Sequence, residues 1–283
     1  MPKSKSTKST PTTPTPPPSR FVFRGSAVPF GGRILRVGDD PTPYNLQSPP
    51  ASALSVAGGH CDATSPGSVF RNTFCWGPSV AQTQGDQRPD GTHVTTVTSA
   101  IQNVQAVNPV PNAAPHVFKA DLLKLTLEST YPKQGQPSIV PTANFGRMLL
   151  NDKDITLSID LPDFCGMSSL EAFDYAFQNV KSVYLKYRGR FLSRTGALPE
   201  FHQPIPRVSN GYVACSFVNA VTWRGKTTPG NALQLTGFGT IYFGEVLMNE
   251  YSRRFTLVRL AMGSTVQADV ALAEGDANGS WIP

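Results

Sequence analysis

The stretch ITLSIDL, residues Ile155–Leu161, carries the clearest structural signal in the chain. Every second residue is apolar, starting at Ile155, and the residues between them are Thr, Ser and Asp. Successive side chains of a β-strand point to opposite faces, so this alternation predicts a strand with one buried and one solvated face. The stretch therefore favours an antiparallel sheet whose apolar side packs on a second layer.

Strand signals of the same kind occur on both sides of this stretch. One segment, Val94–Val107, is ambiguous, because its β-branched residues favour a strand although Val94, Val97, Ile101 and Val104 recur at helical spacing. Residues 39–92 are rich in proline and look irregular, with little periodicity. Because a structureless loop of this length is improbable in a compact domain, we expect the segment to pack against a neighbouring subunit or to contain hidden strands, with Phe70–Trp76 as the best candidate. The other predicted strands are Phe21–Phe23, Arg33–Val37, Val117–Leu127, Val183–Leu192, Tyr212–Trp223, Leu233–Leu247, Phe255–Met262 and Val266–Leu272.

One helix is predicted, over Ser169–Asn179. Ser168 and Glu171 have the spacing of a capping box, and an apolar stripe follows them at helical spacing. Many short strands, one helix and long loops indicate an all-β fold. We predict an antiparallel jelly-roll sandwich formed by residues 21–283 as a single shell domain.

The first twenty residues form a basic arm. They contain Lys, Arg, Ser, Thr and Pro without an acid, and they have too few apolar side chains to offset the entropy of ordering, so we expect disorder. Residues 1–38 hold seven basic residues and no acid, and the remaining chain has 18 basic against 19 acidic residues. The whole positive excess thus lies at one end, which favours a polyanionic partner.

A second basic segment lies within KSVYLKYRGRFLSR, residues 181–194. If it is a strand, four of its cations share one face and repel each other unless an anion neutralises them. Phosphate is a natural partner, whereas a solvated face or pairing with distant acids would explain the same pattern. The four cations are Lys186, Arg188, Arg190 and Arg194.

The acids around the Ile155 strand allow a weaker hypothesis. Side chains at strand ends could share a structural calcium ion, although Asp residues that form turns explain the same pattern. The candidate ligands are Asp152, Asp154, Asp160 and Asp163. We expect no other cofactor.

Signals for catalysis are weak. No G-x-S-x-G motif occurs, the four histidines lack metal-ligand spacing, and Gly237-Phe238-Gly239 does not open a helix. The cysteines form no CxxC pair, which favours free structural thiols over a zinc site or a disulfide. We expect a protein that is not an enzyme. The cysteines are Cys61, Cys75, Cys165 and Cys215.

The basic arm at residues 1–20, followed by strands from about Thr92 to Leu272, resembles the coat proteins of small icosahedral viruses. The resemblance implies a shell of identical subunits in the virion, assembled in the host cytoplasm, with inward arms that bind the packaged genome. RNA is favoured over DNA, and no membrane partner is expected, since no apolar run is long enough to span one. The expected contacts are Lys3, Lys5, Lys8, Arg20 and Arg24, together with the four cations of residues 186–194.

Two other classes remain open. A viral movement protein could share such a core and would bind single strands without forming shells. A cellular β-sandwich recognition domain with a flexible tail would bind no nucleic acid.

Overall fold

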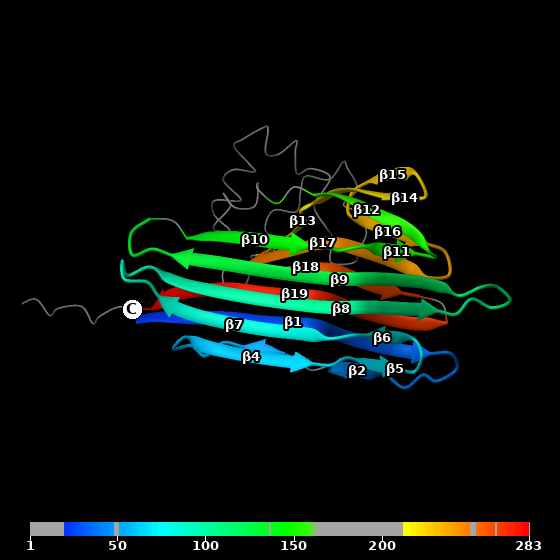
Figure 1. The fold of residues 1–283 in the computed structure, drawn as a ribbon, viewed down its shortest axis with the longest axis horizontal. Helices are drawn as coiled ribbons and strands as arrows, with labels where there is room; N and C mark the ends of the chain where they lie inside the picture. The colour runs from blue at the N-terminus through cyan, green and yellow to red at the C-terminus, as the bar shows by residue number, and fades with distance from the viewer. Residues whose placement is uncertain are drawn as a thin grey trace, which may run out of the picture.

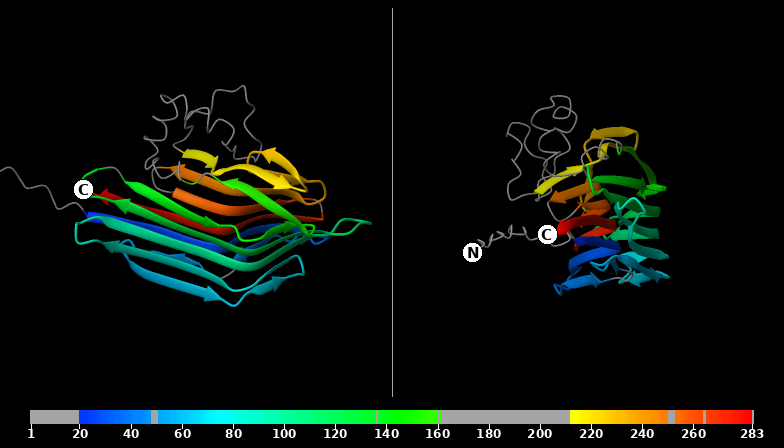
Figure 2. Two further views of the ribbon diagram at one scale, coloured as in Figure 1. Left: turned by 45° about the horizontal axis from the view of Figure 1, so that its top comes forward. Right: turned by 90° about the vertical axis from the view of Figure 1, so that its left-hand side faces the viewer.

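A computed structural model describes residues 20–47, 51–135, 137–159, 161, 212–249, 253–263 and 265–282. Two antiparallel sheets lie face to face as the layers of a sandwich, and every described element is a strand, turn or bend (Figure 1; Figure 2, right). The predicted all-β antiparallel class is confirmed. In these ranges no helix has the length and apolar character that crossing a membrane requires.

The first sheet joins the two ends of the described chain. β1 and β19 pair antiparallel along almost their full length, from Arg20 opposite Ile282 to Val37 opposite Val266. Its strands in spatial order are β13 (Tyr212–Ser216), β17 (Gly239–Asn249), β18 (Arg253–Met262), β19 (Val266–Ile282), β1 (Arg20–Val37) and β2 (Tyr44–Gln47), with β16 (Ala232–Leu235) beside β17 and β3 (Ser52–Ala53) beside β1.

The second sheet is centred on the long hairpin of β8 and β9. Its strands in spatial order are β15 (Lys226–Pro229), β14 (Val218–Trp223), β12 (Lys153–Ile159), β11 (Met148–Leu150), β9 (His116–Tyr131), β8 (His93–Asn108), β6 (Phe74–Trp76) and β5 (Ser68–Phe70). β10 (Ser138–Asn144) also pairs with β9, and β7 (Ser79–Gln87) pairs with β8 and β4 (Gly59–Ser65).

A crease in β8 explains its ambiguous sequence. Val97 and Ile101 are buried, Gln102 and Asn103 both face outward, and burial resumes at Val104. Asn103 has a φ of 50°, a left-handed conformation that turns the backbone and moves the inward side by one residue. The spacing of apolar residues across such a crease resembles the spacing in an amphipathic helix, although the segment is a strand.

The first sheet is creased as well. Leu257 and Val258 of β18 are both fully buried, and so are Leu272 and Ala273 of β19. Ala273 has a φ of 52°, so two successive side chains point into the core. The long strands of both sheets bend part-way along their length (Figure 2, left).

Large aromatic side chains fill the space between the sheets. Phe30 stacks on Trp76 with ring centroids 4.3 Å apart and meets the edge of Phe74 at 5.9 Å. Buried polar groups add hydrogen bonds between the sheets, such as the Thr95 hydroxyl, which donates to the Asn278 carbonyl at 3.0 Å. The fully buried rings are Phe30, Phe74, Phe118, Phe217, Phe238, Phe243 and Phe255.

Several predicted strands are confirmed with altered bounds. The prediction Val117–Leu127 lies in β9, and Phe255–Met262 lies in β18. Tyr212–Trp223 divides into β13 and β14, and Leu233–Leu247 divides into β16 and β17 at a turn around Gly237, whose φ is 83°. Residues 155–159 of the predicted 155–161 strand lie in β12, where Ile155 is buried but Ile159 is 41% exposed, and Val266–Leu272 begins the longer β19.

Two predictions were only partly right. Phe21–Phe23 and Arg33–Val37 are strand, as predicted, but they belong to one strand, β1, because the glycines and the proline between them do not end it beside β19. Residues 39–92 do contain hidden strands, β2 to β7, which are mostly short, and the predicted strand at 70–76 is the hairpin of β5 and β6. The helix at 169–179 and the strand at 183–192 lie outside the described residues.

Candidate nucleic-acid interface

The basic arm joins the sandwich at Arg20. The structure places Arg20, the last residue of the predicted arm, at the start of β1, and residues 1–19 lie outside the described residues. Arg20 is exposed, and Arg24, opposite Asn278 of β19, is half-buried. Lys3, Lys5 and Lys8 lie outside the described residues, as do the four cations of residues 186–194.

A cluster of rings fixes the start of β1, and we call it the arm-root cluster: Phe21, Phe23, His93, Tyr131 and Trp281. Phe21 stacks on His93 at 4.3 Å, and its centroid lies 5.2 Å from those of Tyr131 and Trp281. Phe21 and Phe23 are each 6% exposed. The residues that follow the arm are therefore anchored in the core between the first and last strands.

Burial changes the proton affinity of two groups in this cluster. The Tyr131 hydroxyl donates to the side-chain oxygen of Asn278, and burial raises the pKa of Tyr131. Burial, followed by the charge of Lys133, lowers the pKa of His93, whose Nδ1 has no hydrogen-bond partner. The Arg253 guanidinium lies 5.5 Å from the Tyr131 ring centroid.

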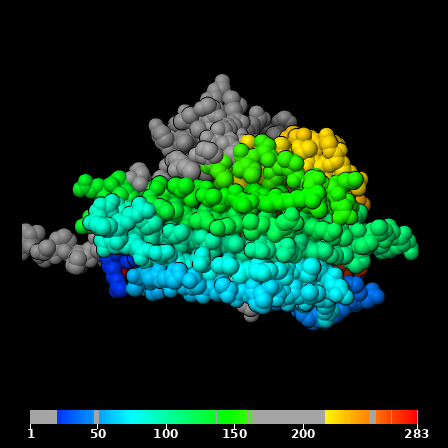
Figure 3. Space-filling model, in the orientation of Figure 1, coloured from blue at the N-terminus to red at the C-terminus, as the bar shows by residue number. Residues whose placement is uncertain are grey.

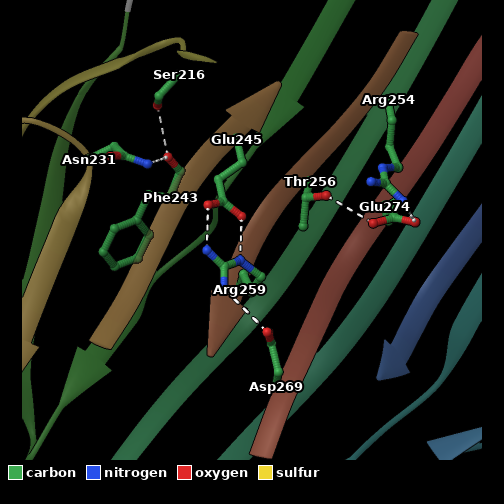
Figure 4. A network of polar contacts seen from close by, with 9 residues as sticks. All are labelled: Ser216, Asn231, Phe243, Glu245, Arg254, Thr256, Arg259, Asp269 and Glu274. Atoms are coloured by element: carbon green, nitrogen blue, oxygen red, sulfur yellow. Dashed lines mark hydrogen bonds and ion pairs between the residues drawn. The ribbon is translucent and has the colours of Figure 1, made fainter. Parts of the chain in front are cut away.

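Arginines of β18 form ion pairs with acids of the neighbouring strands (Figure 4). Arg259 makes two bonds to Glu245, Nε to Oε2 at 2.7 Å and Nη2 to Oε1 at 2.8 Å, and its Nη1 lies 3.4 Å from Asp269. Arg254 lies 3.8 Å from Glu274. These cations are neutralised within the sheet, so they contribute little free positive charge.

Burial also perturbs the acids of this network. It raises the pKa of Glu274, although Arg254 and a hydrogen bond from the Thr256 hydroxyl oppose the shift. Figure 4 also shows Ser216 and Asn231 donating to the carbonyl of Phe243, at 2.9 and 3.0 Å, which ties the end of β13 and the residue before β16 to β17.

The predicted calcium ligands lie in an ion-paired turn. Asn151 and Asp152 have φ values of 52° and 56° and form the two-residue turn between β11 and β12. Asp152 accepts from Lys119 at 2.8 Å, and Asp154 accepts from Arg147 at 2.9 Å. The described ranges contain no group of three or more His, Cys, Asp or Glu that could hold a metal. Asp160 and Asp163 lie outside those ranges.

The neighbouring hairpin, β14–β15, carries cations that sequence reasoning missed. Trp223 pairs with Lys226 across a two-residue turn, Arg224-Gly225, with φ values of 51° and 72°. The Arg224 guanidinium lies 4.4 Å above the Trp223 ring, whose Nε1 donates to the Leu150 carbonyl at 3.1 Å. A glycine between Trp-Arg and Lys-Thr-Thr was the available sequence signal for this turn.

Two cysteines fall in the described ranges with their side chains placed. Cys61 and Cys75 are half-buried free thiols, as predicted for these two positions. His60 lies beside Cys61 in sequence, but its Nε2 is engaged 2.5 Å from the Asp62 carboxylate.

One family model matches the chain over residues 21–249, and it is described as a domain of unknown function (DUF8256). The match covers most of the chain, so the protein belongs to this family. No curated protein and no solved structure matches it.

Proposed function

We propose that this member of the DUF8256 family is a structural coat protein, which self-assembles into an icosahedral shell and binds the packaged genome through its basic arm. The observation that carries the proposal is the distribution of charge. The positive excess lies in residues 1–38, while the body of the chain has 18 basic and 19 acidic residues. Arg254 and Arg259 of β18 are matched by acids, and Arg253 is buried, so attraction for a polyanion is concentrated at the arm.

The arm-root cluster supports this role mechanically. Phe21 and Phe23 follow the arm directly and are packed among His93, Tyr131 and Trp281. A pulling force on an arm bound to nucleic acid would therefore act on the paired strands β1 and β19, and the start of β1 would not detach from the sheet.

The outer face of the second sheet supports self-association. Thr98 and Thr126 share a hydrogen bond across β8 and β9 at 3.2 Å, and Val140 of β10 is 47% exposed. The charges of this face, such as Lys124 and the Arg88–Glu128 ion pair, would then lie at the polar rim of the contact or be matched by the partner subunit.

The coat-protein resemblance also implies jelly-roll connectivity, a virion location with assembly in the host cytoplasm, and a genome of RNA in preference to DNA. We retain these as parts of the proposal. The described strands of β7–β9 and β17–β19 pair in chain order within a sheet. Support therefore comes from the sandwich and its charge distribution and not from the connectivity.

The test is electron microscopy of the purified full chain together with assay of nuclease-protected nucleic acid. We expect closed particles that contain nucleic acid. Deleting residues 1–19 removes three lysines, so the log–log salt slope for single-stranded RNA should fall by up to about 2 units. A full chain that forms no particles and binds no RNA would contradict the proposal.

A further inference from the structure

We propose that the body of the protein holds a second phosphate-binding site, formed by Lys153, Arg224 and Lys226 at the tips of two adjacent hairpins. We call these three residues the hairpin patch. The inference rests on the proposed function and adds a sequence-independent contact for the backbone of single-stranded nucleic acid, remote from the arm.

Strand register brings the three cations together. Lys153 is the first residue of β12 and pairs with Leu150 across the Asn151-Asp152 turn. Ile155 of β12 pairs with Trp223 of β14, so the β11–β12 and β14–β15 turns lie side by side at one end of the sheet. The β14–β15 segment, in yellow, adjoins the green strands of this sheet on the surface (Figure 3).

The nearby acids do not neutralise the hairpin patch. Asp152 is engaged by Lys119, and Asp154 by Arg147. Lys153, Arg224 and Lys226 are exposed, and within the described ranges none of them forms an ion pair at contact distance, although the charge of Lys153, after that of Lys119, helps to lower the pKa of Asp152. An elongated polyanion can therefore bind them without displacing an existing ion pair.

Backbone conformation is a second, independent observation. Both turns need positive φ at two residues, which favours Asn, Asp or Gly. The β11–β12 turn uses the favoured pair Asn151-Asp152, whereas the β14–β15 turn places Arg224 at a φ of 51°. Arginine has no conformational reason to occupy this position, and residues in such strained conformations concentrate at functional sites.

Side-chain packing prepares Arg224 for a ligand. Its guanidinium stacks 4.4 Å from the Trp223 ring, and that ring is held by the bond from Nε1 to the Leu150 carbonyl. Stacking reduces the freedom that the side chain loses on binding and leaves N–H groups for phosphate oxygens. Such contacts position a strand without reading its bases.

The hairpin patch and the arm-root cluster lie at opposite ends of the sandwich. His93, at the start of β8, belongs to the arm-root cluster, and Asn108, at the end of β8, pairs with His116 near the β11–β12 turn. The 16 residues of β8 span roughly 50 Å at about 3.3 Å per residue. The two sites are therefore separate contacts, whose effects on binding can be measured independently.

The test measures binding of a 20-nucleotide oligouridylate to the full chain at several salt concentrations. The double variant R224N/K226T removes two cations and installs the favoured Asn-Gly turn. We expect its salt slope to fall by about 1.4 units and its affinity at 0.1 M salt to fall roughly 10- to 30-fold. The control is K124T, which removes one exposed lysine of β9 away from the hairpins, so loss of charge alone would lower the slope by about 0.7 units.

The outcomes separate the two proposals. Wild-type binding that R224N/K226T leaves unchanged, in a variant with normal thermal unfolding, would overturn the hairpin patch and leave the arm as the binding site. An equal loss in K124T would show general charge attraction and would also overturn it. A wild-type chain that binds no RNA would contradict the proposed function itself.

Discussion

The arm-root end and the hairpin end of the sandwich differ in where their aromatic and charged side chains lie. At the arm root, five rings pack together, and Phe21 and Phe23 are almost fully buried. At the hairpin end, one ring, Trp223, is half-buried and supports an exposed arginine. The difference follows from desolvation: an unpaired cation costs little in water and much in a core. The buried end is therefore suited to anchor the arm, and the exposed end to bind a ligand.

The largest change in stability is expected from a substitution in the arm-root cluster. Phe21→Ala removes a ring that contacts four other rings, so it should destabilise the protein by about 3–5 kcal/mol. Denaturant unfolding measures the change. Val140→Ala, at an exposed position of β10, is the control and should change stability by less than about 0.5 kcal/mol. Equal effects of the two substitutions would show that Phe21 is not part of the core.

A smaller effect is expected from pH. The folded-state pKa of His93 is lowered, so the unfolded chain takes up this proton first as the pH falls below about 6.5. Stability contributed by neutral His93 is present above that pH and is lost below it, by up to about 1.4 kcal/mol per pH unit. His93→Phe keeps the stacked ring and should reduce this loss between pH 6.5 and 5.

Glu274 acts in the opposite direction and must be separated from His93. Its raised pKa favours the protonated acid in the folded state, so its contribution to stability grows as the pH falls. The difference between the wild-type and His93→Phe curves isolates the histidine, because Glu274 is common to both. Parallel curves would contradict the assignment of the pH dependence to His93.

Much of the fold could be predicted from alternation alone. The 117–127 stretch was found because Leu123, Leu125 and Leu127 are buried and alternate with Lys124 and Thr126, whereas residues 255–258 of the 255–262 stretch are all buried. The 94–107 segment stayed ambiguous because the crease at Asn103 shifts that face by one residue. The strands within residues 39–92 escaped prediction because most are only two to seven residues long and show little periodicity.

The candidate site was harder to predict, because charge pairing depends on neighbouring strands. Arg259 and Glu245 are 14 residues apart but adjacent across β18 and β17. A sequence cannot show which cations are neutralised in this way. The sequence also does not distinguish Arg224 from the other arginines, because the proposed role of Arg224 depends on the conformation of its turn and on the position of the neighbouring hairpin.

The smallest expected effect tests the strained turn at the exposed end. Arg224→Asn replaces a residue disfavoured at a φ of 51° with one that tolerates it, so stability should rise by roughly 0.5 kcal/mol. For a chain of this size, that is about 1–2 °C in Tm. Gly225→Ala is the control with the opposite sign: its φ is 72° and a Cβ would meet no neighbour, so any loss reports backbone strain alone. A lower Tm for Arg224→Asn would mean that stacking on Trp223 outweighs the strain, giving the arginine a structural reason to be there. A higher Tm with weaker RNA binding would show that Arg224 lowers the stability of the turn and in return contributes a ligand contact, in contrast to the stabilising role expected for Phe21.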